Sequence, residues 1–255
     1  MYGFLNGDVV QSKPHKKGGR MNGKMDIRGL MKLTLLDFPG KVACTVFTGG
    51  CDFRCPFCHN ASLVLDPASV DPVGEEAVMA LLEKRKGVMD GVCVTGGEPT
   101  LQKDLAGFLA RIKEKGLLVK LDTNGSRPDV LAQVIEDGLV DYVAMDIKNS
   151  PAGYAKTVGI ADFDMTDVKK SAALLLEGRV DYEFRTTVVR ELHRLSDFAD
   201  MAEWLAGARV HYLQRFVDSG DVIAPGFSAW DDDTMEKFRR ILAMTEKRAE
   251  LRGVG

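Results

Sequence analysis

The chain has 255 residues, of which 45% are hydrophobic and 28% charged, and its formal net charge is −3. This composition is typical of a globular protein, and the length approaches the most that one hydrophobic core supports. The small net charge gives no reason to expect a nucleic acid or a membrane surface as a partner, and no apolar run approaches the roughly 20 residues that cross a bilayer.

The first 24 residues differ from the rest of the chain. The stretch QSKPHKKGGRMNGK is basic, contains glycines and has no hydrophobic periodicity. We therefore expect residues 1–24 to form a disordered basic tail and residues 25–255 to form a single domain, with Met25 as an alternative start. A nucleic-acid-binding arm is the competing interpretation, but a few basic residues in a tail are common.

Six short apolar segments, often rich in β-branched residues, predict strands. They cover residues 42–47, 92–95, 117–121, 140–147, 182–189 and 210–216. The segments between them have the apolar spacing of amphipathic helices. The clearest helix, 103–116, ends at Gly116, a residue type that commonly caps the C-terminus of a helix. The other predicted helices are 74–87, 126–138, 166–178, 196–207 and 231–253.

Strands that alternate with helices imply a parallel sheet with right-handed crossovers. Six such units are fewer than the eight of a complete barrel, so we predict an α/β fold, a partial (β/α)6 TIM-type barrel. A doubly wound open sheet is the competing architecture, because periodicity does not separate the two. In both, the carboxyl ends of the strands share one rim, where we predict the active site. Polar or glycine-rich stretches follow all six strands: TGGC, TGGEPT, DTNG, MDIK, FRTT and LQRF.

Three cysteines lie in the loop after the first predicted strand, namely Cys51, Cys55 and Cys58. Clustered thiols in a chain with five cysteines argue against a secreted disulfide framework and for metal binding in the cytoplasm. Thiolates suit an iron–sulfur cluster or zinc, but a structural zinc site takes four ligands. The other two cysteines, Cys44 and Cys93, lie inside predicted strands, where we expect them to pack as small hydrophobic residues.

His59 directly follows the third cysteine of this loop. Because adjacent residues in a short loop rarely bind the same ion, we expect His59 to support or pack against the loop, and its role stays open. A four-iron cluster that is bound by only three thiolates leaves one iron free, and a substrate-like molecule can bind there.

The motif C-x3-C-x2-C in CDFRCPFC resembles the signature of the radical S-adenosylmethionine (SAM) enzymes, and GGEP resembles their SAM-binding motif. Within this superfamily, four stretches are most similar to the activating proteins of anaerobic ribonucleoside-triphosphate reductase, relatives of the pyruvate formate-lyase activases. These stretches are LTLLDFPGKVACTVFTGGCDFRCPFCHN, TGGEPT, LDTNG and MDIK. The resemblance covers about residues 27–220 and is strongest in the first half.

The resemblance implies that Cys51, Cys55 and Cys58 hold one [4Fe–4S] cluster whose open iron binds the amino and carboxylate groups of SAM. An electron from the reduced cluster would cleave SAM, and the resulting 5′-deoxyadenosyl radical would take a hydrogen atom from a glycine of the partner. The implied partner is the glycyl-radical enzyme anaerobic ribonucleotide reductase. The implied electron donor is a protein of the flavodoxin or ferredoxin type.

The resemblance also implies roles for residues that bind SAM. Phe57 would lie near the adenine, although it is also a residue that packs under a loop. Gly96 and Gly97 would let the backbone approach the methionyl ammonium, and Glu98 would accept a hydrogen bond from it. An ordinary strand-to-helix turn is the structural alternative for these three residues.

Two aspartates at neighbouring strand ends, Asp122 and Asp146, would bind the positive charge of SAM or a monovalent cation. Thr123 and the backbone of Met145 would complete such a cation site, since hard oxygen ligands suit it. Lys148 would act in catalysis by pairing with the carboxylate of SAM, or would form a plain salt bridge with Asp146 on the same strand face.

Three further residues complete the implied cofactor site. Asn124 is part of DTNG, although asparagine is also a common turn residue. Arg185 and Gln214 would border the ribose, the adenine or an incoming peptide, with a structural role as the alternative.

Other functions stay open on the sequence alone. The substrate of the radical chemistry could be another glycyl-radical enzyme or a small molecule such as a modified-base precursor. A zinc-bearing binding module without catalysis is the remaining alternative. Residues 217–230 are predicted to form a flexible loop near the rim, where a partner protein could dock.

Overall fold

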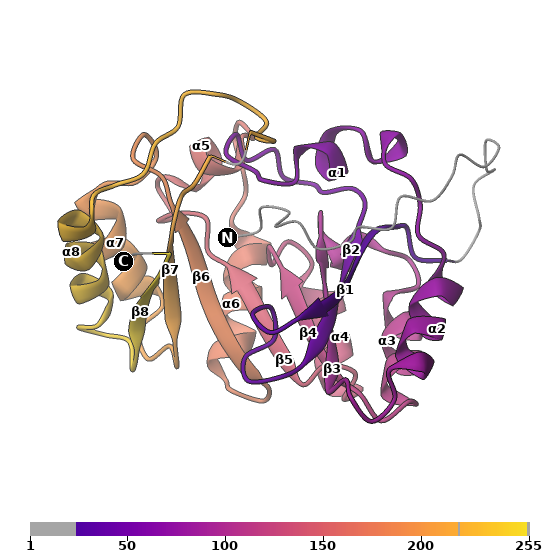
Figure 1. The fold of residues 1–255 in the computed structure, drawn as a ribbon. Helices are drawn as coiled ribbons and strands as arrows, with labels where there is room; N and C mark the ends of the chain where they lie inside the picture. The colour runs from indigo at the N-terminus through magenta and orange to yellow at the C-terminus, as the bar shows by residue number, and fades with distance from the viewer. Residues whose placement is uncertain (1–23, 219, 254–255) are drawn as a thin grey trace.

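The computed structural model describes residues 24–218 and 220–253, so that the predicted tail lies outside the described residues except for Lys24. Eight strands form one sheet in the order of the chain (Figure 1). Strand β1 pairs antiparallel with β2, and every later pair is parallel. The strands are β1 Ile27–Thr34, β2 Ala43–Thr48, β3 Gly91–Gly96, β4 Leu118–Thr123, β5 Tyr142–Asp146, β6 Asp181–Val188, β7 His211–Arg215 and β8 Ala249–Arg252.

Most helices cover the outer face of the curved sheet, with α2 and α3 at one side of Figure 1 and α7 and α8 at the other, whereas α1 and α5 lie above the strand ends. The α-helices are α1 Ala61–Leu65, α2 Glu75–Lys84, α3 Leu105–Lys113, α4 Pro128–Glu136, α5 Tyr154–Val158, α6 Thr166–Leu176, α7 Leu195–Trp204 and α8 Asp232–Leu242. Within the part of the chain that the structure describes, no helix is long and apolar enough to cross a membrane.

The fold confirms the predicted α/β class and the partial barrel, and it adds two strands. The sheet contains seven parallel strands and the antiparallel β1, where the sequence predicted six parallel strands. The prediction of one helix over 231–253 was wrong, because α8 ends at Leu242 and residues 249–252 pair with β7. Five glycines that follow the predicted helices do adopt positive φ: Gly87, Gly116, Gly138, Gly178 and Gly207.

The two faces of the sheet differ in chemistry. Side chains alternate between the faces of a strand, and those on the outer face, such as Val92, Val94 and Val119, are fully buried in the apolar core with the helices. The inner face instead carries buried charged side chains, including Lys120 and Asp122. The concave side of the barrel is therefore polar, and it leads to the rim formed by the strand ends.

Candidate functional site

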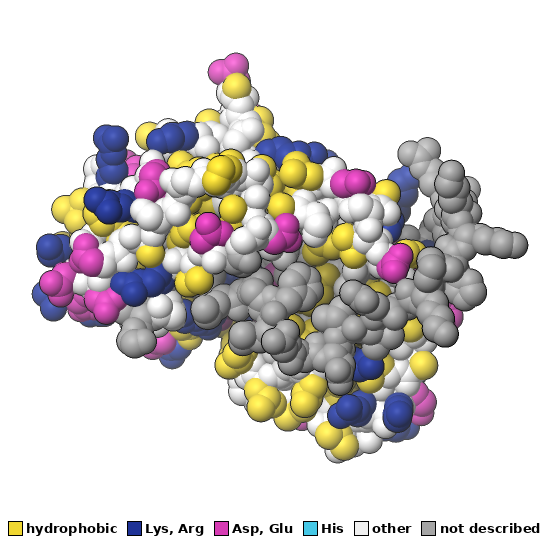
Figure 2. Space-filling model, turned by 45° about the horizontal axis from the view of Figure 1, so that its top comes forward, with side chains coloured by type: hydrophobic (Ala, Val, Ile, Leu, Met, Phe, Trp, Pro, Cys, Tyr) yellow, Lys and Arg dark blue, Asp and Glu magenta, His cyan; other side chains and the backbone are white. Residues whose placement is uncertain are grey.

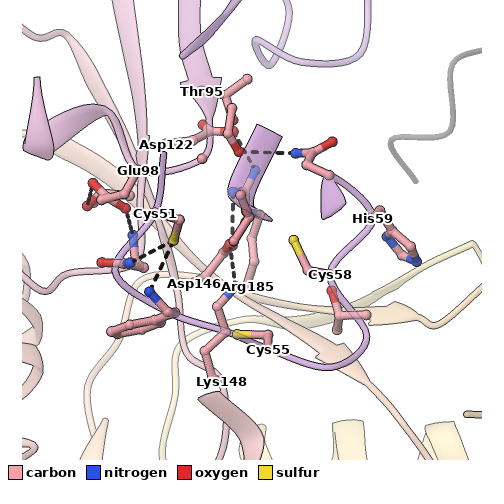
Figure 3. A pocket seen from close by; sticks show the side chains of 18 of the residues that line it. Cys51, Cys55, Cys58, His59, Thr95, Glu98, Asp122, Asp146, Lys148 and Arg185 are labelled. Carbon is pink, nitrogen blue, oxygen red and sulfur yellow. Dashed lines mark hydrogen bonds and ion pairs between the residues drawn. The ribbon is translucent and has the colours of Figure 1, made fainter. Parts of the chain in front are cut away.

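A pocket of about 870 Å³, including its open mouth, lies at the carboxyl ends of the parallel strands (Figure 3). All fourteen residues predicted to form the site line it, which brings together segments that are far apart in the chain. These residues are Cys51, Cys55, Phe57, Cys58, Gly96, Gly97, Glu98, Asp122, Thr123, Asn124, Asp146, Lys148, Arg185 and Gln214. Their individual roles toward a cofactor stay predictions.

The three cysteines of the loop after β2 line the same pocket (Figure 3). The sulfur of Cys51 accepts the backbone N–H of Phe53 at 3.4 Å and lies 3.7 Å from Nδ2 of Asn124. Burial raises the pKa of Cys51 and Cys58 above the usual value and that of Cys55 to about 12. Uncoordinated, all three groups are therefore neutral thiols at neutral pH, and a metal is what stabilises the thiolates here.

The other two cysteines do not line this pocket. Cys44 is fully buried in the apolar core, as predicted for a cysteine within a strand. Cys93 is also fully buried, but it faces the polar interior of the barrel, where its sulfur lies 3.8 Å from both Oδ1 of Asp122 and Nζ of Lys120. The expectation that Cys93 packs as a hydrophobic residue was therefore wrong.

The cysteine loop packs directly on the end of β3. The N–H of Gly97 donates to the carbonyl of Thr48 at 2.8 Å, and the N–H of Glu98 donates to that of Gly50 at 2.8 Å. A Cβ at position 97 would lie 1.9 Å from the carbonyl oxygen of Gly50. Gly96 has a φ of +119°, and a Cβ there would lie 2.2 Å from the nitrogen of Thr48. Gly97 is thus required by the approach of the cysteine loop, and Gly96 by that of the end of β2.

Glu98 joins the ends of β3 and β4. Its carboxylate is buried and accepts hydrogen bonds from the N–H of Thr100 at 3.0 Å, the hydroxyl of Thr123 at 2.8 Å and the N–H of Asn124 at 2.7 Å. The hydroxyl of Thr100 donates to it as well. Burial raises the pKa of Glu98 to about 7, although these donors lower it.

Five charged side chains of alternating sign form a ladder across the inner face of β4, β5 and β6. Nη1 of Arg185 lies 3.0 Å from Oδ2 of Asp122, and its Nε lies 2.9 Å from Oδ1 of Asp146. Lys148 pairs with the other oxygen of Asp146 at 2.9 Å, and Lys120 pairs with Asp122. The register of the sheet explains the central contact, because Asp146 and Arg185 are directly opposite each other.

The ladder carries three positive and two negative side chains, of which Lys120 does not line the pocket, so the ladder members that do line it balance in charge. Burial alone would raise the pKa of Asp146, but Arg185 and Lys148 hold it at about 2. Asp122 and Asp146 therefore both pair with the guanidinium of Arg185. This arrangement favours Arg185, rather than a monovalent cation, as the positive charge between the two carboxylates. Lys148 forms the salt bridge that the sequence left as one of two alternatives.

His59 lies against the ring of Phe216 at the end of β7, with centroids 5.4 Å apart and planes 15° from parallel. Burial lowers the pKa of His59, so the ring is neutral at neutral pH. Residues 220–230, the larger part of the predicted loop 217–230, are attached to the cysteine loop, since Ala224 donates its N–H to the carbonyl of Pro56 at 2.9 Å.

Sequence reasoning missed several residues of the pocket. Asn60 donates from Nδ2 to the carbonyl of Gly96 at 3.1 Å and so ties the cysteine loop to β3. The sequence could have identified Lys120, because side chains two residues apart in a strand point to the same face of the sheet, and Lys120 is two residues before Asp122. Lys120 itself does not line the pocket, and the pocket residues that were not assigned, besides Asn60, are Phe53, Val64 and Thr95.

A curved parallel sheet with three thiols in the loop after β2, at the rim formed by the strand ends, is typical of an α/β enzyme with a cofactor at that rim. Residues 45–205 match the profile of the radical SAM superfamily, and the chain therefore belongs to that superfamily. The enzyme thus uses a [4Fe–4S] cluster and SAM. Three soft thiols in one loop, with an N–H directed at one sulfur, are a donor set that fits such a cluster.

Curated relatives have several activities. The chain is 31% identical over 198 residues to a protein of Methanocaldococcus jannaschii named as a glycyl-radical enzyme activating enzyme, covering 74% of this chain and 79% of that one. It is 31% identical over 143 residues to the pyruvate formate-lyase-activating enzyme of Streptococcus mutans, covering 53% and 47%. It is 32% identical over 126 residues to the 7-carboxy-7-deazaguanine synthase of Thermococcus kodakarensis, covering 40% and 47%. The last two matches span about half of those proteins.

Solved structures share the fold. A domain of the pyruvate-formate lyase-activating enzyme from Bacteroides vulgatus aligns with a TM-score of 0.52 at 18% identity, covering 64% of this chain and 99% of that one. SuiB of Streptococcus suis, solved with S-adenosylmethionine, aligns with a TM-score of 0.61 at 12% identity, covering 80% and 48%. At these identities the likeness supports the partial barrel and not a particular substrate.

Proposed function

We propose that this protein is the activating enzyme of an anaerobic ribonucleoside-triphosphate reductase, on which it generates a glycyl radical. The observation that carries the proposal is the 31% identity to the archaeal protein named as a glycyl-radical enzyme activating enzyme, which extends over 79% of that protein. The choice of this reductase among glycyl-radical enzymes rests on the resemblance of LTLLDFPGK, LDTNG and MDIK to its activating proteins.

The cysteine loop is the part of the chain that holds the cofactor. Cys51, Cys55 and Cys58 would bind the cluster, which together with SAM supplies one-electron chemistry capable of taking a hydrogen atom from carbon. The chain provides the position and excludes water. The hydrogen bonds from Gly97 and Glu98 to the loop backbone hold the thiols against the end of β3.

The charges of the pocket match the charges of SAM. Lys148, at the end of the ladder and in the lining of the pocket, would bind the SAM carboxylate. Glu98 would accept a hydrogen bond from the SAM ammonium at Oε2, which receives only that of Asn124 from the described residues. Thr123 and Asn124 would support this contact from β4.

The remaining predicted residues lie around this centre. Phe57 would contact the adenine from the cysteine loop, and Gln214 of β7 would border the ribose or the incoming peptide. Asp122 and Asp146 would act through Arg185, their shared partner, and a monovalent cation beside them remains a prediction.

A macromolecular substrate suits the open barrel. Among the described strands, β1 and β8 end the sheet and do not pair with each other, so the barrel is not closed. The face shown in Figure 2 mixes acidic, basic and apolar side chains. A partner protein could therefore dock there through complementary charges and apolar contacts, without an electrostatic potential of a single sign across the surface. A loop of the reductase would enter the pocket from its open mouth, and a flavodoxin- or ferredoxin-type protein would supply the electron.

The test combines the purified, oxygen-protected protein with SAM, a strong reductant and the anaerobic ribonucleotide reductase of the same organism. A glycyl radical on the reductase, detected by electron paramagnetic resonance, is the expected result. Pyruvate formate-lyase from that organism serves as the comparison partner. SAM cleavage without a radical on the reductase would contradict the assigned partner while leaving the superfamily chemistry intact.

A small-molecule reaction is the second candidate, because the chain is 32% identical over 126 residues to a 7-carboxy-7-deazaguanine synthase. The product of that class would be a modified-base precursor. Incubation with candidate small-molecule precursors of modified bases, followed by mass spectrometry, separates the two candidates. Conversion of one of these small molecules, with no radical on any reductase, would favour the second.

A further inference from the structure

Lys148 lies just beyond the last paired residues of β5 and β6. Those residues are Asp146 and Arg185, and the N–H of Ile147 still donates to the carbonyl of Arg185 at 2.8 Å. Lys148 is one residue further along the chain, and it lines the pocket (Figure 3). A side chain that has to bind a cofactor from this position needs a backbone that other contacts hold in place.

His193, in the loop after β6, makes such a contact. Its side chain is fully buried, and its Nε2 lies 2.8 Å from the carbonyl oxygen of Lys148. Because a carbonyl oxygen only accepts hydrogen bonds, Nε2 is the nitrogen that carries the proton of the neutral ring. Nδ1 then accepts the N–H of Val189 at 3.0 Å. Burial lowers the pKa of His193 below its usual value, which keeps the ring neutral at neutral pH.

The position of His193 itself is fixed by its neighbours. The N–H of His193 donates to the carbonyl of Val189 at 2.9 Å, and the carbonyl of His193 accepts a hydrogen bond from Nε1 of Trp230 at 3.2 Å. The ring packs near Phe198 of α7, with centroids 6.1 Å apart. Because the backbone of His193 is bonded at both its N–H and its carbonyl, Nε2 stays directed at the carbonyl of Lys148.

Other contacts join the loops after β5 and β6 without the histidine ring. Nδ2 of Asn149 donates to the carbonyl of Leu192 at 3.0 Å, and the hydroxyl of Ser150 donates to Oδ1 of Asp197 at 2.8 Å. A variant that lacks Nε2 of His193 keeps these bonds, so we expect it to fold. His193 does not line the pocket, so an effect of this residue on a bound cofactor must pass through a residue that it holds.

We propose that His193 is a positioning residue, which directs the ammonium of Lys148 at the carboxylate of SAM by holding the Lys148 carbonyl. The inference rests on the role proposed for Lys148 above. The stem of a lysine is long and flexible, so two contacts are needed to hold its ammonium in one place. Asp146 holds the ammonium end at 2.9 Å, and His193 holds the backbone end.

Two substitutions of His193 separate this role from packing. The amide nitrogen of glutamine extends about as far as Nε2, so His193→Gln can still donate to the Lys148 carbonyl, whereas the shorter His193→Asn cannot reach it. The measurement is the SAM dissociation constant of the anaerobically reconstituted holoprotein with the cluster left oxidised. His193→Asn should raise this constant roughly 3- to 30-fold, the worth of a weakened hydrogen bond to a charged group. His193→Gln should stay close to the wild type, and an equal loss of affinity in both variants would overturn the proposal.

A double-mutant cycle with Lys148→Met shows whether His193 acts through Lys148. In the Lys148→Met background, His193→Asn should weaken SAM binding no further, because the ammonium that it positions is already gone. The same fold-change in both backgrounds would contradict the inference, as would loss of iron and sulfide in His193→Asn, which would show a structural role. Unchanged SAM affinity in Lys148→Met would refute the role proposed for Lys148 and this inference with it. Weaker binding in Lys148→Met but not in His193→Asn would refute the inference alone.

The tautomer of His193 provides a readout that does not involve SAM. Nitrogen NMR of the ring in the isotope-labelled wild type should show a neutral imidazole that is protonated at Nε2 at neutral pH. Protonation at Nδ1 alone would exclude the hydrogen bond to the Lys148 carbonyl and overturn the proposal. These measurements do not depend on the partner protein, so they are independent of the glycyl-radical test of the proposed function.

Discussion

The α-carbon of Gly97 lies so near Gly50 that a Cβ at position 97 would be 1.9 Å from the Gly50 carbonyl oxygen. That oxygen also accepts the N–H of Glu98 at 2.8 Å. The second glycine of the GGE motif therefore seats the cysteine loop on β3, which is a structural reason for glycine before any contact with SAM.

Gly97→Ala should consequently displace the cysteine loop. We expect a several-fold loss of iron and sulfide bound per chain after anaerobic reconstitution, with the fold retained by circular dichroism. Gly74→Ala is the control, because a Cβ there meets no atom closer than 3.4 Å and its φ is negative. Full cluster occupancy in Gly97→Ala would show that the loop tolerates the shift.

Arg185 should be the most costly member of the charge ladder to remove. Arg185→Gln leaves Asp122 without one of its two cationic partners in a fully buried setting, and breaking such a network typically costs about 3–5 kcal/mol. The free energy of unfolding from urea denaturation of the cluster-free protein checks this. Arg179→Gln, which removes an exposed ion pair with Glu177, should cost less than about 1 kcal/mol. If Arg185→Gln and Arg179→Gln lower the free energy of unfolding equally, the buried ladder contributes no more to stability than an exposed ion pair does.

Glu98 predicts a specific pH dependence of stability. Its pKa is about 7 in the folded protein and near 4.5 when unfolded, so the folded state binds the proton more tightly. The stabilisation is complete below pH 4.5 and is lost as the pH rises to about 7, a change of up to roughly 3 kcal/mol.

Urea denaturation of the cluster-free protein at pH 5, 6 and 7 measures this loss. Glu98→Gln should flatten the pH dependence relative to the wild type. Glu114→Gln, at the exposed C-terminal end of α3, should not change it. If Glu98→Gln and the wild type keep parallel pH profiles, the raised pKa of Glu98 is wrong.

The sequence located the site because parallel strands place their carboxyl ends on one rim. Cys51, Glu98, Asp122, Asp146 and Arg185 are separated by up to 134 residues, yet all line one pocket, where the strand-end rule placed them. The apolar segments were sufficient to assign six strands. They therefore also predicted which strand end carries each of these residues.

The sequence did not reveal the features that depend on register and packing. Strand β8 is only four residues long, so the apolar–polar alternation of AELR is too short to separate it from the helical segment before it, and its pairing with β7 is set by the sheet beside it. The bridge that Arg185 makes between Asp122 and Asp146 depends on which residues are opposite in neighbouring strands.

The central claim is that three thiols of one loop hold the cluster that serves the radical chemistry. The most direct measurement is iron and sulfide per chain, with the electron paramagnetic resonance of the reduced protein, for wild type, Cys55→Ala and Cys93→Ala after anaerobic reconstitution. We predict about four iron and four sulfide for the wild type and for Cys93→Ala, and loss of the cluster in Cys55→Ala. Zinc without sulfide in the wild type, or an intact cluster in Cys55→Ala, would contradict the account.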